Sequence, residues 1–176
     1  EANNWTWDED RKIDIRSGGT VIEAARPIFQ PDYHWLGRNA KPEDKARLID
    51  LIQIGGDGSN AGLWQDDSNR TQLVFMGSGS GSILSCLVPS HVDFLRLLAI
   101  RYDEICWPEH YHESPEEAGE KNGMLALPNL DFHNWVSSTF NTTIPEIAAE
   151  ILPHPAQMDD GPYDDPFWQW VESVRA

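Results

Sequence analysis

The chain has 176 residues, of which 40% are hydrophobic and eight are tryptophan, so a single folded domain can bury its core without disulfides or metals. It carries 13 Lys and Arg against 29 Asp and Glu, and the formal charge of −16 disfavours binding to nucleic-acid phosphates or anionic membranes. This charge favours a basic partner, although it is also typical of proteins that need it for solubility alone. No apolar run approaches the ~18 residues of a membrane span.

The cellular location is predicted from the start of the chain and from its cysteines. No secretory leader is visible, but the chain begins at Glu1 without Met, so a leader that has been removed stays an open alternative. Cys86 lies in an apolar run and Cys106 at the end of a predicted helix, which favours reduced core thiols, with a single disulfide as the alternative. We therefore expect a cytoplasmic protein.

The first third of the chain contains one predicted helix. Residues 1–19 are expected to be peripheral, and residues 20–36 are mixed, with two Xaa-Pro steps that disfavour a long helix. Pro42 suits the first position of a helix, and apolar residues recur after it at helical spacing until the Gly55-Gly56 pair. This pattern predicts a helix from Pro42 to about Ile52.

Three short runs after Gly56 are predicted to be strands, namely Ala61–Gln65, Thr71–Met76 and Ser82–Val88. They are rich in apolar and β-branched residues and are bounded by turn residues. The Gly/Ser segment from Gly77 to Gly81 is predicted to be a hairpin connection between the last two.

Helices are predicted for most of the second half. The first, from Ser90 to about Ile105, is apolar around most of its circumference and should be buried on most sides. Three amphipathic helices follow: Leu130–Phe140, with an apolar stripe that includes Trp135; Thr143–Leu152, with a Thr143-x-x-Glu146 capping box; and one that begins after Asp165-Pro166. The elements predict an α+β fold, in which helices cover a central, mainly antiparallel sheet.

The order of these elements resembles the SMI1/KNR4 superfamily. The segment Gly55-Gly56-Asp57-Gly58-Ser59 is similar to the Gly/Asp turn that precedes the central strands of that family. Ser90 with Val92-Asp93-Phe94-Leu95 resembles the start of its long helix, and the ending from Asp164 to Val171 resembles bacterial members. The resemblance covers roughly Lys41 to Val174 and departs from the family before that. It implies one SMI1/KNR4-like domain over residues 1–176, with its core in 41–174 and with 1–40 peripheral.

Several groups of residues are compatible with catalysis or metal binding. His110 and His112 lie among carboxylates in a segment flanked by prolines, which is typical of a surface loop, with a metal site as the alternative. Asp57, Asp66 and Asp67 lack the residue order of a calcium-binding EF-hand loop, and the segment Gly77–Gly81 lacks the Lys of a phosphate loop. No serine or cysteine has the setting of a nucleophile. We therefore expect no catalytic residue, metal or cofactor.

Acidic residues with neighbouring aromatic side chains form the predicted binding surface. One cluster consists of Glu113, Glu116, Glu117 and Glu120. The second consists of Asp159, Asp160 and Asp164, with Tyr163 and Trp168 beside it. Carboxylates around an aromatic anchor suit a basic protein partner, with an ordinary solvated face as the alternative. Trp64, at the predicted edge of the sheet, is a further candidate.

The resemblance implies a non-catalytic immunity protein that binds and neutralises a cognate bacterial toxin in competition between bacteria, as one half of a toxin–antitoxin pair. Toxins met by this superfamily include nucleases, deaminases and enzymes that consume NAD. A basic nuclease is a natural target, because an acidic inhibitor can imitate the charge of phosphates. A regulatory or scaffold domain with several weak partners is one alternative, and a small metal-dependent hydrolase that uses His110 and His112 is another.

Overall fold

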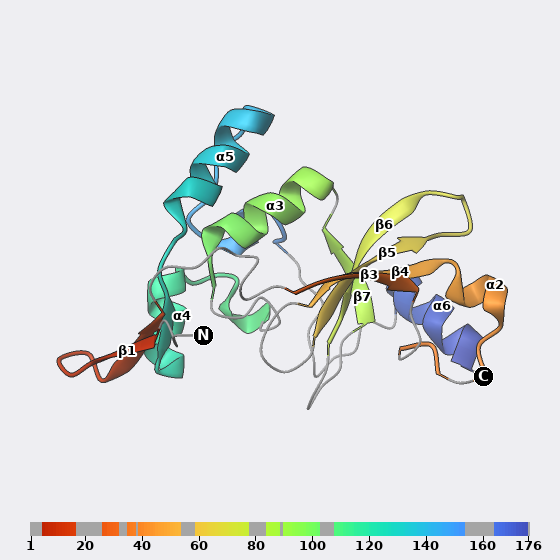
Figure 1. Ribbon diagram of the computed structural model, residues 1–176, viewed down its shortest axis with the longest axis horizontal. Coiled ribbons are helices and arrows are strands. Elements are labelled where there is room, and N and C mark those ends of the chain that lie inside the picture. The colour runs from red at the N-terminus through yellow and green to blue at the C-terminus, as the bar shows by residue number, and fades with distance from the viewer. Residues whose placement is uncertain are drawn as a thin grey trace. The chain divides into compact units, whose positions relative to one another are not determined.

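A computed structural model describes residues 5–16, 26–31, 35–37, 39–53, 59–77, 84–88, 90–102, 108–153 and 164–175. The chain divides into two compact units (Figure 1). Unit 1 consists of Glu1–Ala24 and Val92–Pro155, and unit 2 of Ala25–His91 and Ala156–Ala176. Both helices and strands are present, which confirms the α+β class. The prediction of one domain over 1–176 stays a prediction. Within the described residues no helix is both long and apolar enough to cross a membrane.

Unit 2 is built on a five-stranded sheet in which each strand pairs with its neighbour in sequence. The order is β3-β4-β5-β6-β7 and every pairing is antiparallel. The strands are β3 (Arg26–Pro31), β4 (Leu48–Gln53), β5 (Asn60–Gln65), β6 (Thr71–Met76) and β7 (Leu84–Val88). The predicted strands Ala61–Gln65 and Thr71–Met76 are confirmed, because such runs between turn residues favour the pleated conformation.

The predicted helix from Pro42 to Ile52 is wrong. Helix α2 (Pro42–Lys45) ends after one turn, and β4 begins at Leu48. Along β4, Leu48 and Asp50 are buried whereas Ile49 is 40% exposed, so the burial alternates as in a strand. A short apolar run matches both helical and strand spacing, and here pairing with β3 and β5 decides in favour of the strand.

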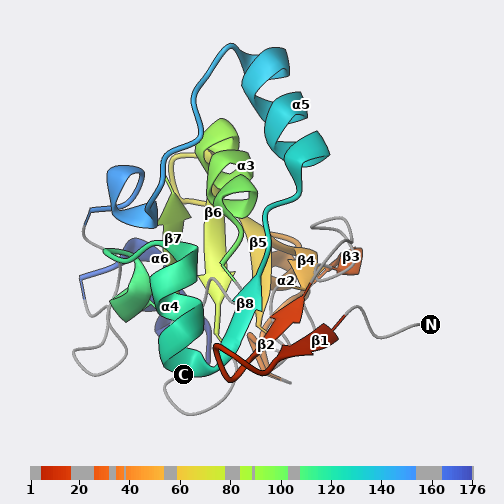
Figure 2. The same ribbon diagram turned by 90° about the vertical axis from the view of Figure 1, so that its left-hand side faces the viewer.

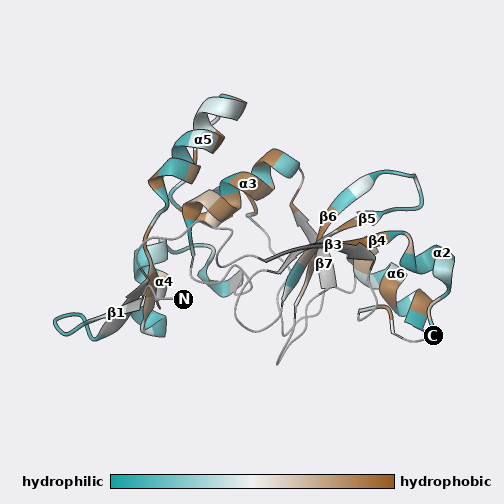
Figure 3. Ribbon diagram, in the orientation of Figure 1, coloured by the Kyte–Doolittle hydropathy of each residue, from teal (hydrophilic) through white to brown (hydrophobic). Residues whose placement is uncertain are grey.

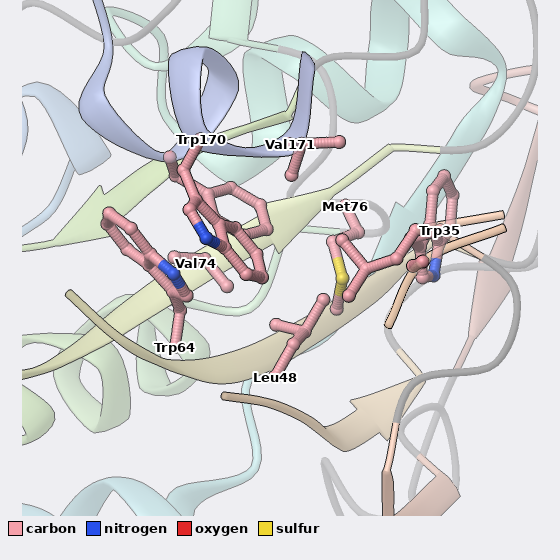
Figure 4. Packing of buried hydrophobic residues seen from close by; sticks show 10 residues of the cluster. Trp35, Leu48, Trp64, Val74, Met76, Trp170 and Val171 are labelled. Atoms are coloured by element: carbon pink, nitrogen blue, oxygen red, sulfur yellow. The ribbon is translucent and has the colours of Figure 1, made fainter. Parts of the chain in front are cut away.

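Helix α6 (Pro166–Arg175) packs against this sheet and completes the core of unit 2 (Figure 4). Asp165 begins the helix, since its Oδ1 accepts hydrogen bonds from the backbone N–H of Phe167 at 2.8 Å and of Trp168 at 3.2 Å. Phe167 and Val171 are fully buried, which stabilises the fold by about 1.5–3 kcal/mol for each such side chain. The predicted cap and apolar stripe of the last helix are therefore confirmed.

Unit 1 contains a small sheet in which β2 (Ile13–Arg16) lies between β1 (Trp5–Asp8) and β8 (Met124–Ala126). The β1–β2 pair is an antiparallel hairpin, and β8 joins β2 in parallel (Figure 2). Residues expected to be peripheral thus provide two of the three strands of this sheet.

The helices of unit 1 agree with the sequence in part. Helix α3 (His91–Ile100) is mostly buried, as predicted, but it ends at Ile100, where Arg101 adopts a left-handed φ of 73°. Helix α5 (Leu130–Phe140) has the predicted bounds, and the Asn129 side chain caps it by accepting from the Phe132 N–H at 3.0 Å. Helix α4 (Pro115–Asn122) was not predicted.

The predicted helix Thr143–Leu152 is wrong, because the segment contains one 3-10 turn, η2 (Ala148–Glu150). Its backbone donors bind partners far away in the chain. The N–H of Ala148 donates to the hydroxyl of Tyr102 at 2.8 Å, and that of Ala149 donates to the carbonyl oxygen of Tyr111 at 2.8 Å. Tertiary hydrogen bonds have replaced the intrahelical ones that the apolar spacing alone would predict.

Candidate functional site

The first predicted acidic cluster is brought together by helix α4. Ser114 and Glu117 form a capping box: the Glu117 N–H donates to Ser114 Oγ at 3.2 Å, and Glu117 Oε2 accepts from the Ser114 N–H at 2.8 Å. These hydrogen bonds, of which the one from the Ser114 backbone has the largest effect, lower the pKa of Glu117. Glu117 is therefore a capping residue, and it holds the helix in place for its neighbours.

Glu116 and Glu120 lie one turn apart on α4, and both side chains are well exposed, at 67% and 55%. Arg11 bridges them, since its Nη2 lies 2.6 Å from Glu116 Oε1 and 3.0 Å from Glu120 Oε1. Arg11 is positioned by the turn after β1, where Asp8 Oδ1 accepts from the N–H of Arg11 at 3.0 Å. The pair is thus a fixed, solvent-facing array of two carboxylates with one guanidinium at its side.

Glu113 is engaged within the same segment and is less exposed, at 23% of its side chain. It pairs with Lys121 and with Nδ1 of His110, the latter at 3.0 Å, and the hydrogen bond from Lys121 has the largest effect in lowering the Glu113 pKa. Nε2 of His110 lies 3.2 Å from Nδ2 of Asn122. Both ring nitrogens of His110 therefore have partners inside this turn.

The residues weighed as alternatives for metal binding are placed only in part by the structure. No group of three or more His, Cys, Asp or Glu that could hold a metal ion occurs in the part of the chain that the structure describes. Asp66 pairs with Arg70 at 2.9 Å and Asp67 with Arg47 at 2.8 Å, while Asp57 lies outside the described residues. Cys106 and residues 78–81 of the Gly77–Gly81 segment also lie outside them.

The second predicted cluster is described in part. Asp159, Asp160 and Tyr163 lie outside the described residues. Asp164 is exposed just before α6, whereas Trp168 is partly buried and packs against the core of unit 2. This cluster belongs to unit 2 and the α4 cluster to unit 1.

The placement of Trp64 at a sheet edge is wrong. Trp64 lies on β5, the central strand, and is 2% exposed. Its ring centroid lies 5.4 Å from that of Phe167 and 5.4 Å from that of Trp170, so its apolar surface is used by the core (Figure 4). Trp64 is one of the residues that line an open hollow of about 360 Å³ between the β5–β6 turn and α6.

Charge is distributed unequally between the two units. Unit 1 contains 17 acidic and 6 basic residues, a formal charge of −11, whereas unit 2 contains 12 acidic and 7 basic residues, a formal charge of −5. Sequence reasoning identified the charge of the whole chain, but its concentration in unit 1 depends on which segments pack together. The pair of Glu116 and Glu120 on α4 is therefore part of the more acidic unit.

Comparisons with models of known protein families, with curated proteins and with solved structures find no match. The geometry of α4 and the resemblance seen in the sequence are therefore the two observations that bear on function.

Proposed function

We propose that this chain is an immunity protein, which binds and neutralises a cognate bacterial toxin through an acidic protein–protein interface and catalyses no reaction. The observation that carries the proposal is the array of Glu116 and Glu120 in unit 1. Two exposed carboxylates are held at fixed positions by Arg11, in a unit with a formal charge of −11. We also propose that the fold is of the SMI1/KNR4 type, on the basis of the sequence motifs and the antiparallel sheet of unit 2.

Electrostatics makes a basic toxin the partner that suits this surface. A strongly negative field accelerates encounter with a positive surface, and carboxylates that are already ordered lose little side-chain entropy on binding. Nuclease toxins carry such positive surfaces because they hold phosphates. The inhibitor would act in the cytoplasm, where it would meet the toxin before its substrate does.

The proposal is tested with the gene that directly precedes the gene for this chain, since an immunity gene is expected directly downstream of its toxin gene. Expression of the preceding gene alone should arrest growth, and co-expression of this chain should restore it. The purified pair should bind at nanomolar affinity or better, with a stoichiometry of one to one, and should remain bound near 0.5 M salt.

The role of α4 is tested with the double variant Glu116→Lys/Glu120→Lys. It should slow association with the toxin by about tenfold or more at low salt, because like charges then face each other. The matched control is Glu43→Lys/Glu146→Lys, which makes the same change in net charge at two exposed positions elsewhere. Equal slowing by both variants would show that net charge alone matters. Weak binding of several proteins, lost at high salt, would instead favour a regulatory domain.

A further inference from the structure

Large apolar side chains are exposed mainly in unit 1. Those with more than a third of their surface exposed, among the described residues, are Trp7, Ile49, Met124, Leu127, Leu130, Trp135 and Phe140. All except Ile49 belong to unit 1. Single exposed apolar residues are ordinary on protein surfaces, but several on one element mark an interaction site.

Helix α5 concentrates three of them. Leu130 is 67% exposed, Trp135 48% and Phe140 38%, while Val136, one turn before Phe140, is fully buried. Apolar residues recur along this helix among polar ones (Figure 3). The sequence pattern alone would place the apolar stripe of this helix against other elements, and the structure leaves Trp135 and Phe140 of that stripe exposed.

The aromatic side chains of this face are arranged before any partner binds. The Trp135 ring stacks on Phe132 with centroids 5.8 Å apart and meets the Phe140 ring edge-on at 5.8 Å. Asn129 caps the first turn, and Asn141 ends the helix in the left-handed conformation with a φ of 49°. A rigid aromatic row of this kind is typical of binding hot spots, because little entropy is lost when it is covered.

The charges of unit 1 indicate what covers this face. Helix α5 carries the exposed Asp131 and no Lys or Arg. The chain from Asn122, the end of the acidic helix, to Leu130 spans at most about 29 Å when fully extended. A standard interface of about 800 Å² per partner is roughly 30 Å across, so one partner can contact the end of α4 and the start of α5. A second copy of the chain would instead bring two units of charge −11 together.

We propose that the contacting rings of Trp135 and Phe140 on α5 are the apolar anchor site for a basic protein partner, whose positive rim meets Glu116 and Glu120. The inference rests on the proposed immunity function and adds to it the residues that dominate affinity. The acidic array steers the partner and affects the association rate, whereas the aromatic face slows dissociation.

The test uses the full chain and the toxin domain encoded by the preceding gene, inactivated by mutation. Trp135→Ala/Phe140→Ala should weaken binding by more than about 30-fold, mostly through faster dissociation. Trp7→Ala removes an equally exposed Trp from β1 and is the matched control, expected to bind like wild type. Trp135→Lys should bind more weakly than Trp135→Glu, because the partner is basic. Thermal unfolding of each variant verifies that the fold persists.

The outcomes separate the two proposals. Wild-type protection and binding that the α5 variants leave unchanged would overturn the anchor site and leave the immunity function standing. Failure of the wild-type chain to bind or protect would overturn both. Sedimentation of the wild-type chain at low and high salt completes the test, because a dimer that Trp135→Ala/Phe140→Ala dissolves would show that a second copy covers α5.

Discussion

The hydroxyl of Tyr102 accepts a 2.8 Å hydrogen bond from the backbone N–H of Ala148, across 46 residues of sequence. The same hydroxyl donates to the carbonyl oxygen of Glu113 at 2.8 Å. One side chain at the end of α3 therefore satisfies two backbone groups from two other segments of unit 1. Burial of the hydroxyl raises the pKa of Tyr102, so it remains a neutral donor and acceptor at physiological pH.

Tyr102→Phe should destabilise the protein by about 1–3 kcal/mol, because it leaves a backbone donor and a backbone acceptor without their partner. Urea unfolding gives the change in free energy. Ser138→Ala is the control, because the exposed Ser138 hydroxyl donates within α5, to the carbonyl oxygen of Asn134. This variant should change the unfolding free energy by less than about 0.5 kcal/mol. Equal stability of Tyr102→Phe and wild type would mean that water replaces the hydroxyl.

Gly119→Ala should destabilise unit 1, although alanine favours helices by about 1 kcal/mol over glycine. An added Cβ would lie 2.6 Å from the carbonyl oxygen of Met124 and 3.0 Å from Cα of Leu125, which are backbone atoms of β8 that cannot move aside alone. Helix α4 approaches β8 closely because Gly119 has no side chain. Thermal unfolding measures the effect. Ala118→Gly in the same turn is the comparison, because it lowers helix propensity and removes one buried methyl group without adding a contact to β8. A rise in the melting temperature of Gly119→Ala would contradict the close approach.

Asp66 makes the stability depend on pH in acid. Backbone hydrogen bonds, first that from Arg70, lower its pKa from 3.8 to about 2 in the folded protein. A lowered folded-state pKa means that the stabilisation is present above pH 3.8 and is lost as the pH falls towards 2. Asp66→Asn should therefore be less stable than wild type at pH 7, and the difference should shrink between about pH 4 and pH 2. The unfolding free energies of wild type and Asp66→Asn over this range measure the difference. A difference that is constant with pH would mean that the charge of Asp66 does not contribute and that only its hydrogen-bond geometry matters.

The burial of two tryptophans, Trp64 and Trp135, can be compared directly by mutation. Trp64→Ala should cost about 3–5 kcal/mol, because Trp64 is 2% exposed and lies against Phe167 and Trp170. Trp135→Ala should cost far less, since its ring is 48% exposed. Chemical denaturation of both variants measures the loss of unfolding free energy. A larger loss for Trp135→Ala than for Trp64→Ala would contradict the difference in burial between the two residues.

Local signals in the sequence were sufficient to predict several elements. Helix α6 was predicted because Asp165, Pro166 and the apolar spacing after them all agree, and β6 because its apolar run lies between turn residues. The helix predicted at Thr143 failed, because Tyr102 and Tyr111 bind its backbone from a distance. Helix α4 was missed although Ser114, Pro115 and Glu117 form a recognisable capping box, because Gly119 suggested an interruption. A helical glycine that meets a strand cannot be distinguished from a breaker without the tertiary contact.

The residue types of the candidate site could be predicted from the sequence, but their arrangement in space could not. The acidic residues around Glu116 were evident in the sequence, whereas the bridge from Arg11 joins positions 105 and 109 residues apart and has no local signal. Trp64 and Trp135 are both apolar aromatic residues in amphipathic elements. Whether such a residue faces a neighbouring element or solvent depends on packing between elements, which periodicity does not specify.

The bridge from Arg11 to Glu116 and Glu120 should slow association with a basic toxin. Arg11 neutralises part of the array, so Arg11→Ala should speed association with a basic toxin, most at low salt, because both carboxylates then act on the partner alone. The midpoint of unfolding should change little, since the bridge lies at the surface. Stopped-flow association rates at two salt concentrations measure the effect. Lys12→Asn removes the same charge from the neighbouring residue, keeps its left-handed φ of 57° accessible, and leaves the bridge intact. Equal acceleration by both variants would assign the effect to net charge, whereas slower association of Arg11→Ala would show that the bridge is needed to hold the carboxylates in their binding geometry.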